Sequence, residues 1–554
     1  MRIKSVKGAC AVVAIVVVAA GTPVALAAAN GAEGTDQPAS AVAASLSDPA
    51  GLPSKQQQSN TLNAALAYMR ANYQALYKDY GGNDVTDIFD YGISTLWQSG
   101  TDGAGTTVAI VTAWDDPNVE SNVAAFDKGF HLPNPQIQTI YPAGALPSKC
   151  PPQMNSYTGT CASWANEETI DVDAIHLIAP YAKILVAVAP PDTQEADDPA
   201  SNGAPPEFMK ALETISSQHL ANVISISGGT GESTYGDGDA AIRAQDAGEL
   251  EAAAAGIPVL VATGDSGVVQ ALPTAQGGTD TTTTPDIATW SDSPWVTAVG
   301  GSVPHMSSTA PTKLGPDPLW SHEGGGYSSV FTRPSYQDGV SSASTRSVPD
   351  ITMDAQIGTS EAAPLLAGVL ALATQENEGD LGPINPALYD VLGPAGTRDG
   401  ISDVVSGNNS ATVIPPGGST SFTVPGFAAG TGFDVASGWG TIYAPSFVPA
   451  LVAASRASAE EATARGQAQS QLTDLEQHGI EVTRTSSGDV YLHADGLLPG
   501  HPAQLTIDGT KIATLTVNPL GDVTYMIDPT QLKLGSGRHD VTLESMLLNE
   551  TAQF

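Results

Sequence analysis

Short apolar runs alternate with longer amphipathic segments through the first half of the chain. The runs predict four buried strands, at 108–111, 184–188, 223–227 and 259–262. Helical spacing of apolar residues predicts helices through 167–177, 208–217 and 240–255, one before each of the last three strands. Three consecutive helix-then-strand units imply right-handed crossovers, and therefore an α/β fold whose parallel sheet carries helices on both faces.

The pattern changes beyond residue 455. Residues 456–478 are rich in alanine, glutamate and glutamine, which predicts a connecting helix. From 479 to 554, short strands separated by turns such as Asp508-Gly509 predict a small all-β sandwich of the immunoglobulin-like type. Such a module is either a stability appendage or a binding unit for a cell-wall or surface ligand, and no residue decides between the two.

The chain begins with the pattern of a secretory signal peptide, residues 1–27. Basic residues precede an apolar run from Ala9 to Ala20, and Ala25-Leu26-Ala27 supplies a cleavage site. An uncleaved membrane anchor is the alternative, but the run is shorter than the roughly 20 residues that a spanning helix needs. We therefore expect a secreted, extracellular protein without stable membrane association.

Residues 28–82 are expected to form a polar spacer, to about residue 60, followed by a helix over 61–80 with apolar residues on one side. Once the signal is removed, Cys150 and Cys161 are the remaining cysteines. In an exported protein, such a pair predicts a disulfide rather than two free thiols.

Composition limits the partners of this protein. The chain has 21 Lys and Arg against 58 Asp and Glu, a formal charge of −37 at pH 7. This balance excludes nucleic acid and anionic membranes as partners, because binding them relies on clustered basic residues. At about pH 4 many of the carboxylates would be protonated, so the same composition suits a protein that works in acid.

Glycines and small polar residues follow two of the predicted strands. Ser227-Gly228-Gly229 ends one strand, and Thr263-Gly264-Asp265-Ser266-Gly267 follows the next. Ligands of parallel α/β sheets gather at the carboxyl ends of the strands, and glycines there let an extended peptide approach closely. Either segment alone would be an ordinary turn.

Gly358-Thr359-Ser360 precedes a long apolar helix. A serine at a helix N-terminus has an exposed hydroxyl and a backbone N–H that can stabilise an oxyanion, although a plain N-cap serine is the commoner arrangement. A nucleophilic serine also needs a base. None of the nine histidines lies in the His-Gly-Thr context of subtilisins, and His176 comes closest.

The helix through 167–177 offers a different base. Glu167 and Asp171 are four residues apart and therefore lie on one helix face. Two carboxylates so placed repel each other unless they share a proton or a hydrogen bond, so one of them should have a raised pKa. A solvated acidic face is the alternative, but the apolar neighbours leave little of this helix free to face water.

Together these motifs resemble those of the sedolisins, or serine-carboxyl peptidases. In chain order they are Glu167-x-x-x-Asp171-Val172-Asp173, Ser225-x-Ser227-x-Gly229-x-x-Glu232, Gly264-Asp265-Ser266-Gly267 and Gly358-Thr359-Ser360. The resemblance implies a subtilisin-like peptidase domain, to which we assign residues 83–455. It also implies an acid-acting endopeptidase that cleaves protein or peptide substrates and works as a monomer.

The resemblance implies a role for each site residue. Ser360 would be the nucleophile, Glu167 the general base, and Asp171 the residue that orients Glu167. Asp265 would donate to the oxyanion, which a carboxyl group can do only when it is protonated. The segment Ser227, Gly228 and Gly229 would bind the substrate.

The resemblance also implies one structural Ca²⁺. Asp403-Val404 and Gly430-Thr431-Gly432-Phe433-Asp434 match the family's ligand pattern. Two carboxylates with the carbonyls of Val404, Gly430 and Gly432, completed by water, suit a hard cation. Outside this family order, Gly-x-Gly-x-Asp would be a turn capped by its aspartate.

Three features depart from the family. The region before the first strand is too short for a large folded propeptide, which is therefore expected to be reduced or absent. Gly228 stands where an aromatic residue is usual, and Glu361 stands where a small residue usually follows the nucleophile. The alternative function is a catalytically inactive subtilisin-fold protein that serves surface binding or adhesion.

Overall fold

The structure is a computed structural model. It describes residues 52–147, 149–150, 160–189, 206–234, 242–243, 246–273, 279–415, 418–457, 480–484, 490–494, 497, 502–517, 523–535, 537–544 and 549–553. The predicted signal peptide and all but the first two residues of the predicted connecting helix lie outside the described residues. Within the described ranges, no helix combines the length and the apolar character that crossing a membrane requires.

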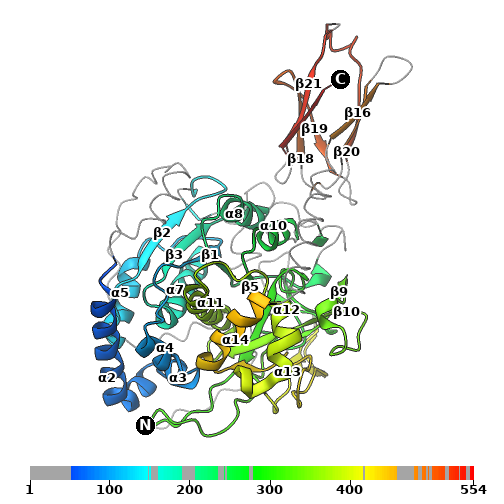
Figure 1. Ribbon diagram of the computed structural model, residues 1–554. Helices are drawn as coiled ribbons and strands as arrows, with labels where there is room; N and C mark the ends of the chain where they lie inside the picture. Colours follow the sequence, from blue (N-terminus) through cyan, green and yellow to red (C-terminus); the bar gives the residue numbers. More distant parts are fainter. Residues whose placement is uncertain are drawn as a thin grey trace.

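A seven-stranded sheet forms the centre of the α/β domain (Figure 1), with the strand order β11-β8-β5-β4-β1-β3-β2. Every neighbouring pair is parallel, as predicted. The strands are β1 (Thr107–Thr112), β2 (Gln136–Ile140), β3 (Lys183–Val188), β4 (Val223–Ile226), β5 (Val259–Ala262), β8 (Thr297–Ser302) and β11 (Ile351–Asp354). The apolar runs predict the four central strands but not β2, β8 and β11, whose sequences contain more polar residues or glycine.

Helices cover both faces of this sheet, as predicted. Along β1, Val108 and Ile110 belong to one hydrophobic cluster, whereas Ala109 and Val111 belong to another. The first cluster contains residues of α5 (Val119–Phe130), α7 (Cys161–Ile178), α11 (Thr359–Asn377) and α14 (Ala444–Ala457); the second contains residues of α8 (Pro206–Ser217) and α10 (Ala247–Ala255). Helix α10 begins later than the pattern indicates, because Asp246 lies in a turn.

The N-terminal helix α2, Lys55–Asp79, begins earlier than the predicted residue 61. Ser54 caps it, since its hydroxyl accepts from the Gln57 N–H at 3.4 Å while the Gln57 side chain accepts from the Ser54 N–H at 3.0 Å. Its apolar face packs into the same cluster as α7 and α11. The polar spacer therefore ends before residue 54, because this capping box starts the helix there.

The remaining elements of the α/β domain are short. They are helices α3 (Val85–Asp90), α4 (Ile93–Ser99), α12 (Asn385–Ala387) and α13 (Gly393–Ala395), and strands β6 (Ala271–Pro273), β7 (Thr279–Thr281), β9 (Gly326–Thr332), β10 (Thr345–Val348), β12 (Ile401–Ser402), β13 (Ala411–Val413), β14 (Phe422–Val424) and β15 (Thr441–Ile442). A disulfide joins Cys150 to Cys161, as predicted, and so fixes the first residue of α7.

The C-terminal part contains two antiparallel sheets, drawn in orange and red in Figure 1. One has the order β16-β17-β20, from Ile480–Arg484, Val490–Ala494 and Val523–Ile527; the other has the order β19-β18-β21-β22, from Thr510–Thr516, Pro502–Ile507, Asp540–Glu544 and Asn549–Gln553. Both contribute to one hydrophobic cluster of their own. The predicted turn at Asp508-Gly509 joins β18 to β19, with positive φ angles at both residues.

Candidate functional site

The predicted catalytic residues come from three parts of the α/β domain. Glu167 and Asp171 lie on α7, Asp265 follows β5, and Ser360 is the second residue of α11. Ser227 directly follows β4. The parallel topology places the ends of β4 and β5 at one edge of the sheet, so these side chains meet around the N-terminus of α11.

Asp265 caps α11 from outside the helix. Its Oδ1 accepts from both the backbone N–H and the hydroxyl of Thr359, each at 2.8 Å. Gly358 has a φ of +130°, and a Cβ at that position would lie 2.7 Å from Asp265 Oδ2. Only glycine therefore lets Asp265 approach the turn that carries Ser360. Burial raises the pKa of Asp265 above its ordinary value, although the Thr359 donors oppose the shift.

Ser227 connects the two helices of the site. Its Oγ donates to Asp171 Oδ1 at 2.7 Å and lies 3.2 Å from the backbone carbonyl oxygen of Ser360. The side chain is 5% exposed. The sequence assigns Ser227 to substrate binding, but the structure places its hydroxyl within the carboxylate network. Its hydroxyl is thus already engaged when substrate arrives.

The two carboxyl groups of α7 that are predicted to be catalytic, Glu167 and Asp171, both have raised pKa values. Burial is the main cause of the rise to about 7 at Glu167, the charge of Asp265 adds to it, and the hydroxyls of Ser360 and Ser227 oppose it. Burial and the charge of Glu167 hold the pKa of Asp171 well above its usual range. Glu167 Oε1 and Asp171 Oδ2 are buried without a donor among the described residues. A shared proton would satisfy both oxygens.

Two tryptophans flank Gly228, where the family usually has an aromatic residue. A Cβ on Gly228 would lie 3.3 Å from both Trp164 and Trp290. Trp164 precedes Glu167 by one turn of α7, and Phe208 stacks on Trp290 with ring centroids 4.8 Å apart. The sequence analysis misses these aromatics; the spacing of Trp164 from Glu167 is the one signal that could have indicated them.

Glu323 is a second residue that the sequence analysis misses. Its side chain is fully buried and accepts from the Thr263 hydroxyl at 2.9 Å and from the Gly301 N–H. Burial holds its pKa well above the usual range, and the charge of Asp265 contributes. Through its bond from Thr263, Glu323 therefore holds the start of the loop after β5, which also carries Asp265. Its position directly before Gly324-Gly325-Gly326 is the available sequence signal.

His176 belongs to the packing of α7 rather than to the site. Its Nε2 lies 2.6 Å from the carbonyl oxygen of Pro133 and 3.1 Å from Asp127, and its side chain is buried. Within the described residues, no histidine hydrogen-bonds to Ser360, Glu167 or Asp265. A histidine base of the subtilisin kind is therefore not in place here.

The predicted calcium residues lie together at a separate position. Gly432 N–H donates to Asp403 Oδ2 at 2.9 Å, and Gly430 N–H donates to Asp434 Oδ2 at 2.7 Å. The Val404 carbonyl accepts from the Ser437 hydroxyl at 3.4 Å. Asp403 Oδ1 is buried without a donor among the described residues. A buried carboxylate oxygen without a partner fits a cation at this position.

Glu361, which stands where a small residue is usual, does not place its charge at the surface beside Ser360. Its side chain is 3% exposed and turns into the protein, toward Asp87 and Asp354. Residues at successive helix positions point in different directions, which is why Glu361 and Ser360 face different surroundings.

The comparisons with known proteins agree with this geometry. The sequence profile of the subtilase family matches residues 156–388. The chain is 28% identical over 341 residues to kumamolisin of Bacillus sp. (strain MN-32), covering 56% of this chain and 55% of that protein. It is 30% identical over 274 residues to sedolisin of Pseudomonas sp. (strain 101), covering 45% and 43% respectively. The chain thus spans about half the length of the curated relatives it matches.

A solved structure extends the similarity to the fold. Pseudomonas sedolisin, described as a serine-carboxyl proteinase complexed with two molecules of pseudo-iodotyrostatin, is 26% identical with a TM-score of 0.51. The match covers 64% of this chain and 94% of that one. The motif order, the parallel sheet and these similarities together support the resemblance of this chain to the sedolisins.

Proposed function

We propose that this protein is a secreted, acid-acting serine-carboxyl endopeptidase. The observation that carries the proposal is the hydroxyl of Ser227, which bridges Asp171 on α7 and the backbone of Ser360 on α11. Asp265 binds the preceding residue, Thr359, from the opposite segment. These contacts gather carboxyl groups around the turn that carries Ser360, which supports a role for Ser360 and these carboxyl groups in acyl transfer.

The acylation step uses the groups in turn. Glu167 accepts the Ser360 hydroxyl proton as the oxygen attacks the peptide carbonyl, and later returns that proton to the leaving amine. Asp265 Oδ1 already accepts two bonds from Thr359, so a proton on Oδ2 would donate to the oxyanion. The Ser360 N–H is the second donor. A water molecule then attacks the acyl-enzyme, and the same proton transfers through Glu167 release Ser360.

The proton balance sets the working pH. Asp265 must be protonated to donate, and its charged form raises the pKa of Glu167. Protonating Asp265 removes that repulsion, so Glu167 ionises more readily in the acid state of the site than its pKa of about 7 indicates. Activity should therefore fall toward neutral pH as Asp265 loses its proton.

Protein or peptide chains are the proposed substrates. Gly228 and Gly229 carry no side chain that would obstruct an extended peptide at the carboxyl end of β4. Trp164 and Trp290 flank Gly228 and would line the adjoining subsite with aromatic surface. These tryptophans would then favour apolar or aromatic substrate side chains there.

We assign one structural Ca²⁺ to Asp403, Asp434 and the carbonyls of Val404, Gly430 and Gly432. The unpartnered Asp403 Oδ1 supports this assignment. The ion would tie the segment after β12 to the loop before β15. The C-terminal sheets are proposed to form an immunoglobulin-like sandwich, which serves either as a stability appendage or as a binding unit for a cell-wall or surface ligand.

Hydrolysis of an unfolded protein between about pH 3 and pH 7 tests the peptidase assignment. We expect cleavage that is strongest in acid and absent in Ser360→Ala. Ser121→Ala, at an exposed position on α5, is the matched control and should retain full activity. Absence of Ser360-dependent cleavage across this range would favour the inactive surface-binding alternative instead.

A further inference from the structure

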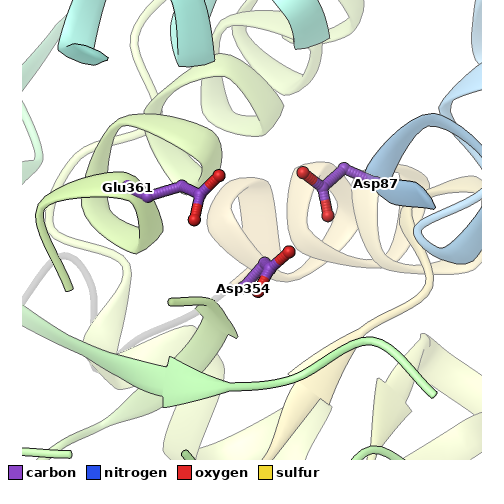
Figure 2. Close-up of side chains that lie close together, drawn as sticks. All are labelled: Asp87, Asp354 and Glu361. Carbon is purple, nitrogen blue, oxygen red and sulfur yellow. The ribbon is translucent and has the colours of Figure 1, made fainter. Parts of the chain in front are cut away.

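Three acidic side chains meet inside the domain, away from the substrate-facing surface. Asp87 comes from α3, Asp354 ends β11, and Glu361 lies on the first turn of α11. One carboxylate oxygen from each lies within 4.8 Å of the other two. Figure 2 shows the three carboxylates pointing toward a common centre. All three side chains are buried.

The polar partners of these groups are unevenly distributed. Asp354 accepts from the backbone N–H of Gln356 at 3.0 Å and from its side chain at 3.2 Å, and Glu361 accepts from the Ile357 N–H at 3.4 Å. Asp87, fully buried, has no donor to either oxygen among the described residues. The loop between β11 and α11 thus fixes two carboxylates, while Asp87 points into the cluster, where its side chain contacts Asp354 and receives no N–H or hydroxyl donor among the described residues.

No basic side chain within the described ranges pairs with this cluster. Lys313 forms ion pairs with Asp90 at 2.9 Å and with Asp317 at 3.0 Å, so its charge is balanced by these two carboxylates. Asp84 brings a further negative charge that repels Asp87 and Glu361. Buried carboxylates without a counter-ion repel one another. Three carboxylates that converge on one point offer the oxygen ligands that a hard cation binds.

We propose that a hard divalent cation binds between Asp87, Asp354 and Glu361. Oxygen ligands without histidine or cysteine select ions of the Ca²⁺, Mg²⁺ and Mn²⁺ class, and water would complete the coordination shell. The site is distinct from the one assigned to Asp403 and Asp434, because it shares no residue with it.

The cation would act on the position of the nucleophile. Glu361 follows Ser360 directly, whereas Asp87 belongs to the short helix α3 before the first strand. Binding would tie α3 to the first turn of α11 and to the end of β11. This also gives a physical reason for a glutamate at 361, where the family usually has a small residue.

The test measures the number of metal ions bound per chain rather than peptidase activity, so its outcome does not depend on the peptidase proposal. Ser360→Ala protein, which cannot digest itself, is stripped with chelator, equilibrated with Ca²⁺ or Mn²⁺ at about pH 6 and analysed for bound metal by mass spectrometry. Asp87→Asn in this background should bind one ion fewer per chain. Asp79→Asn, at the exposed end of α2, is the control and should bind as many ions as the parent.

A second pair of variants keeps the proposal falsifiable if Asp87→Asn does not fold. Glu361→Ala, which restores a small residue, should also lose one ion while retaining its circular dichroism. Asp434→Asn, which removes the other assigned site, should still bind an ion. Full ion binding in folded Glu361→Ala, or a complete absence of ions in folded Asp434→Asn, would overturn the proposal.

Discussion

Ser227 shows how a single hydroxyl can organise this site. It lies 56 positions after Asp171 and 133 positions before Ser360 along the chain, yet it contacts both. Its bond to Asp171 joins two buried groups, and a buried acceptor that loses its donor is costly. Under the proposed mechanism, Ser227 would be a positioning residue for Asp171 and for the turn that carries Ser360.

Replacing Ser227 by alanine should lower kcat/KM by about 10- to 100-fold, because leaving the buried Asp171 Oδ1 without its donor costs roughly 1–3 kcal/mol. Ser225→Ala is the matched control, since Ser225 lies two residues earlier on β4, is also buried and has no partner for its hydroxyl among the described residues. Steady-state kinetics on a peptide substrate give kcat/KM for both variants and for the parent. Equal losses in the two variants would show that Ser227 has no special role.

Asp265→Asn separates the acid requirement from the rest of the mechanism. An asparagine can still accept the Thr359 bonds through Oδ1, and its amide donates at every pH. In the parent, kcat/KM should fall as the pH rises through the elevated pKa of Asp265. In the variant, this alkaline limb should move toward higher pH or vanish. An unchanged alkaline limb in the pH profile would exclude Asp265 as the titrating donor.

At the scale of elements, the packing of α11 on α7 sets the distance between Ser360 and Glu167, the proposed nucleophile and base. Gly368 of α11 lies directly on Ile178 at the end of α7, where an added Cβ would come within 2.7 Å of the Ile178 Cβ. Ser360 and Glu167 are carried by these same two helices. A glycine in the middle of a helix lowers its stability, so close approach is the reason it is accommodated here.

Gly368→Ala should therefore destabilise the protein by about 1–3 kcal/mol, despite the better helix propensity of alanine. Activity should fall with it, since α11 must shift away from α7. Urea unfolding measures the first effect and peptide hydrolysis the second. Gly379→Ala, just beyond α11 with open space around its Cα, should leave both nearly unchanged. An equally stable Gly368→Ala would contradict this account of the helix contact.

Some elements can be predicted from the local pattern of apolar residues alone. The apolar runs at 108–111, 184–188, 223–227 and 259–262 predict the central strands because both faces of those strands are covered. The start of α2 depends on Ser54 and Gln57, a capping pair that the apolar spacing alone does not reveal. Periodicity reports which face is buried, whereas caps and turns decide where an element begins.

At the scale of the whole molecule, buried carboxyl groups are a common feature. Burial raises the pKa of Glu168 to about 9 and that of Asp246 to about 6, against ordinary values near 4. A carboxyl whose pKa is raised on folding stabilises the folded state fully below its unfolded pKa. That stability is lost as the pH rises through the folded pKa.

The melting temperature should therefore be highest in acid and should fall by several degrees between about pH 4, where unfolded carboxyl groups titrate, and about pH 9, the folded pKa of Glu168. Differential scanning calorimetry across this range gives the profile. Glu168→Gln should flatten it, since an amide does not ionise, whereas the exposed Glu120→Gln should not. A melting temperature that rises toward pH 9 would be incompatible with carboxyls buried in neutral form.

The sequence by itself determined the parts of this protein that depend on local order. The α/β alternation, the motifs around Ser360, and the cysteine pair are all readable along the chain, because each depends on residue type and short spacing. These features were enough to indicate the family and to nominate Glu167, Asp171 and Asp265 as partners of the serine.

The tertiary structure decided which distant side chains share one environment. Trp164 and Trp290 meet around Gly228, and Asp87 joins Glu361 although more than half of the peptidase domain separates them in sequence. Periodicity identifies a buried face but not the residue that will face it across the core. Packing between elements therefore decides which charged groups surround a buried carboxylate. No local sequence pattern contains this information.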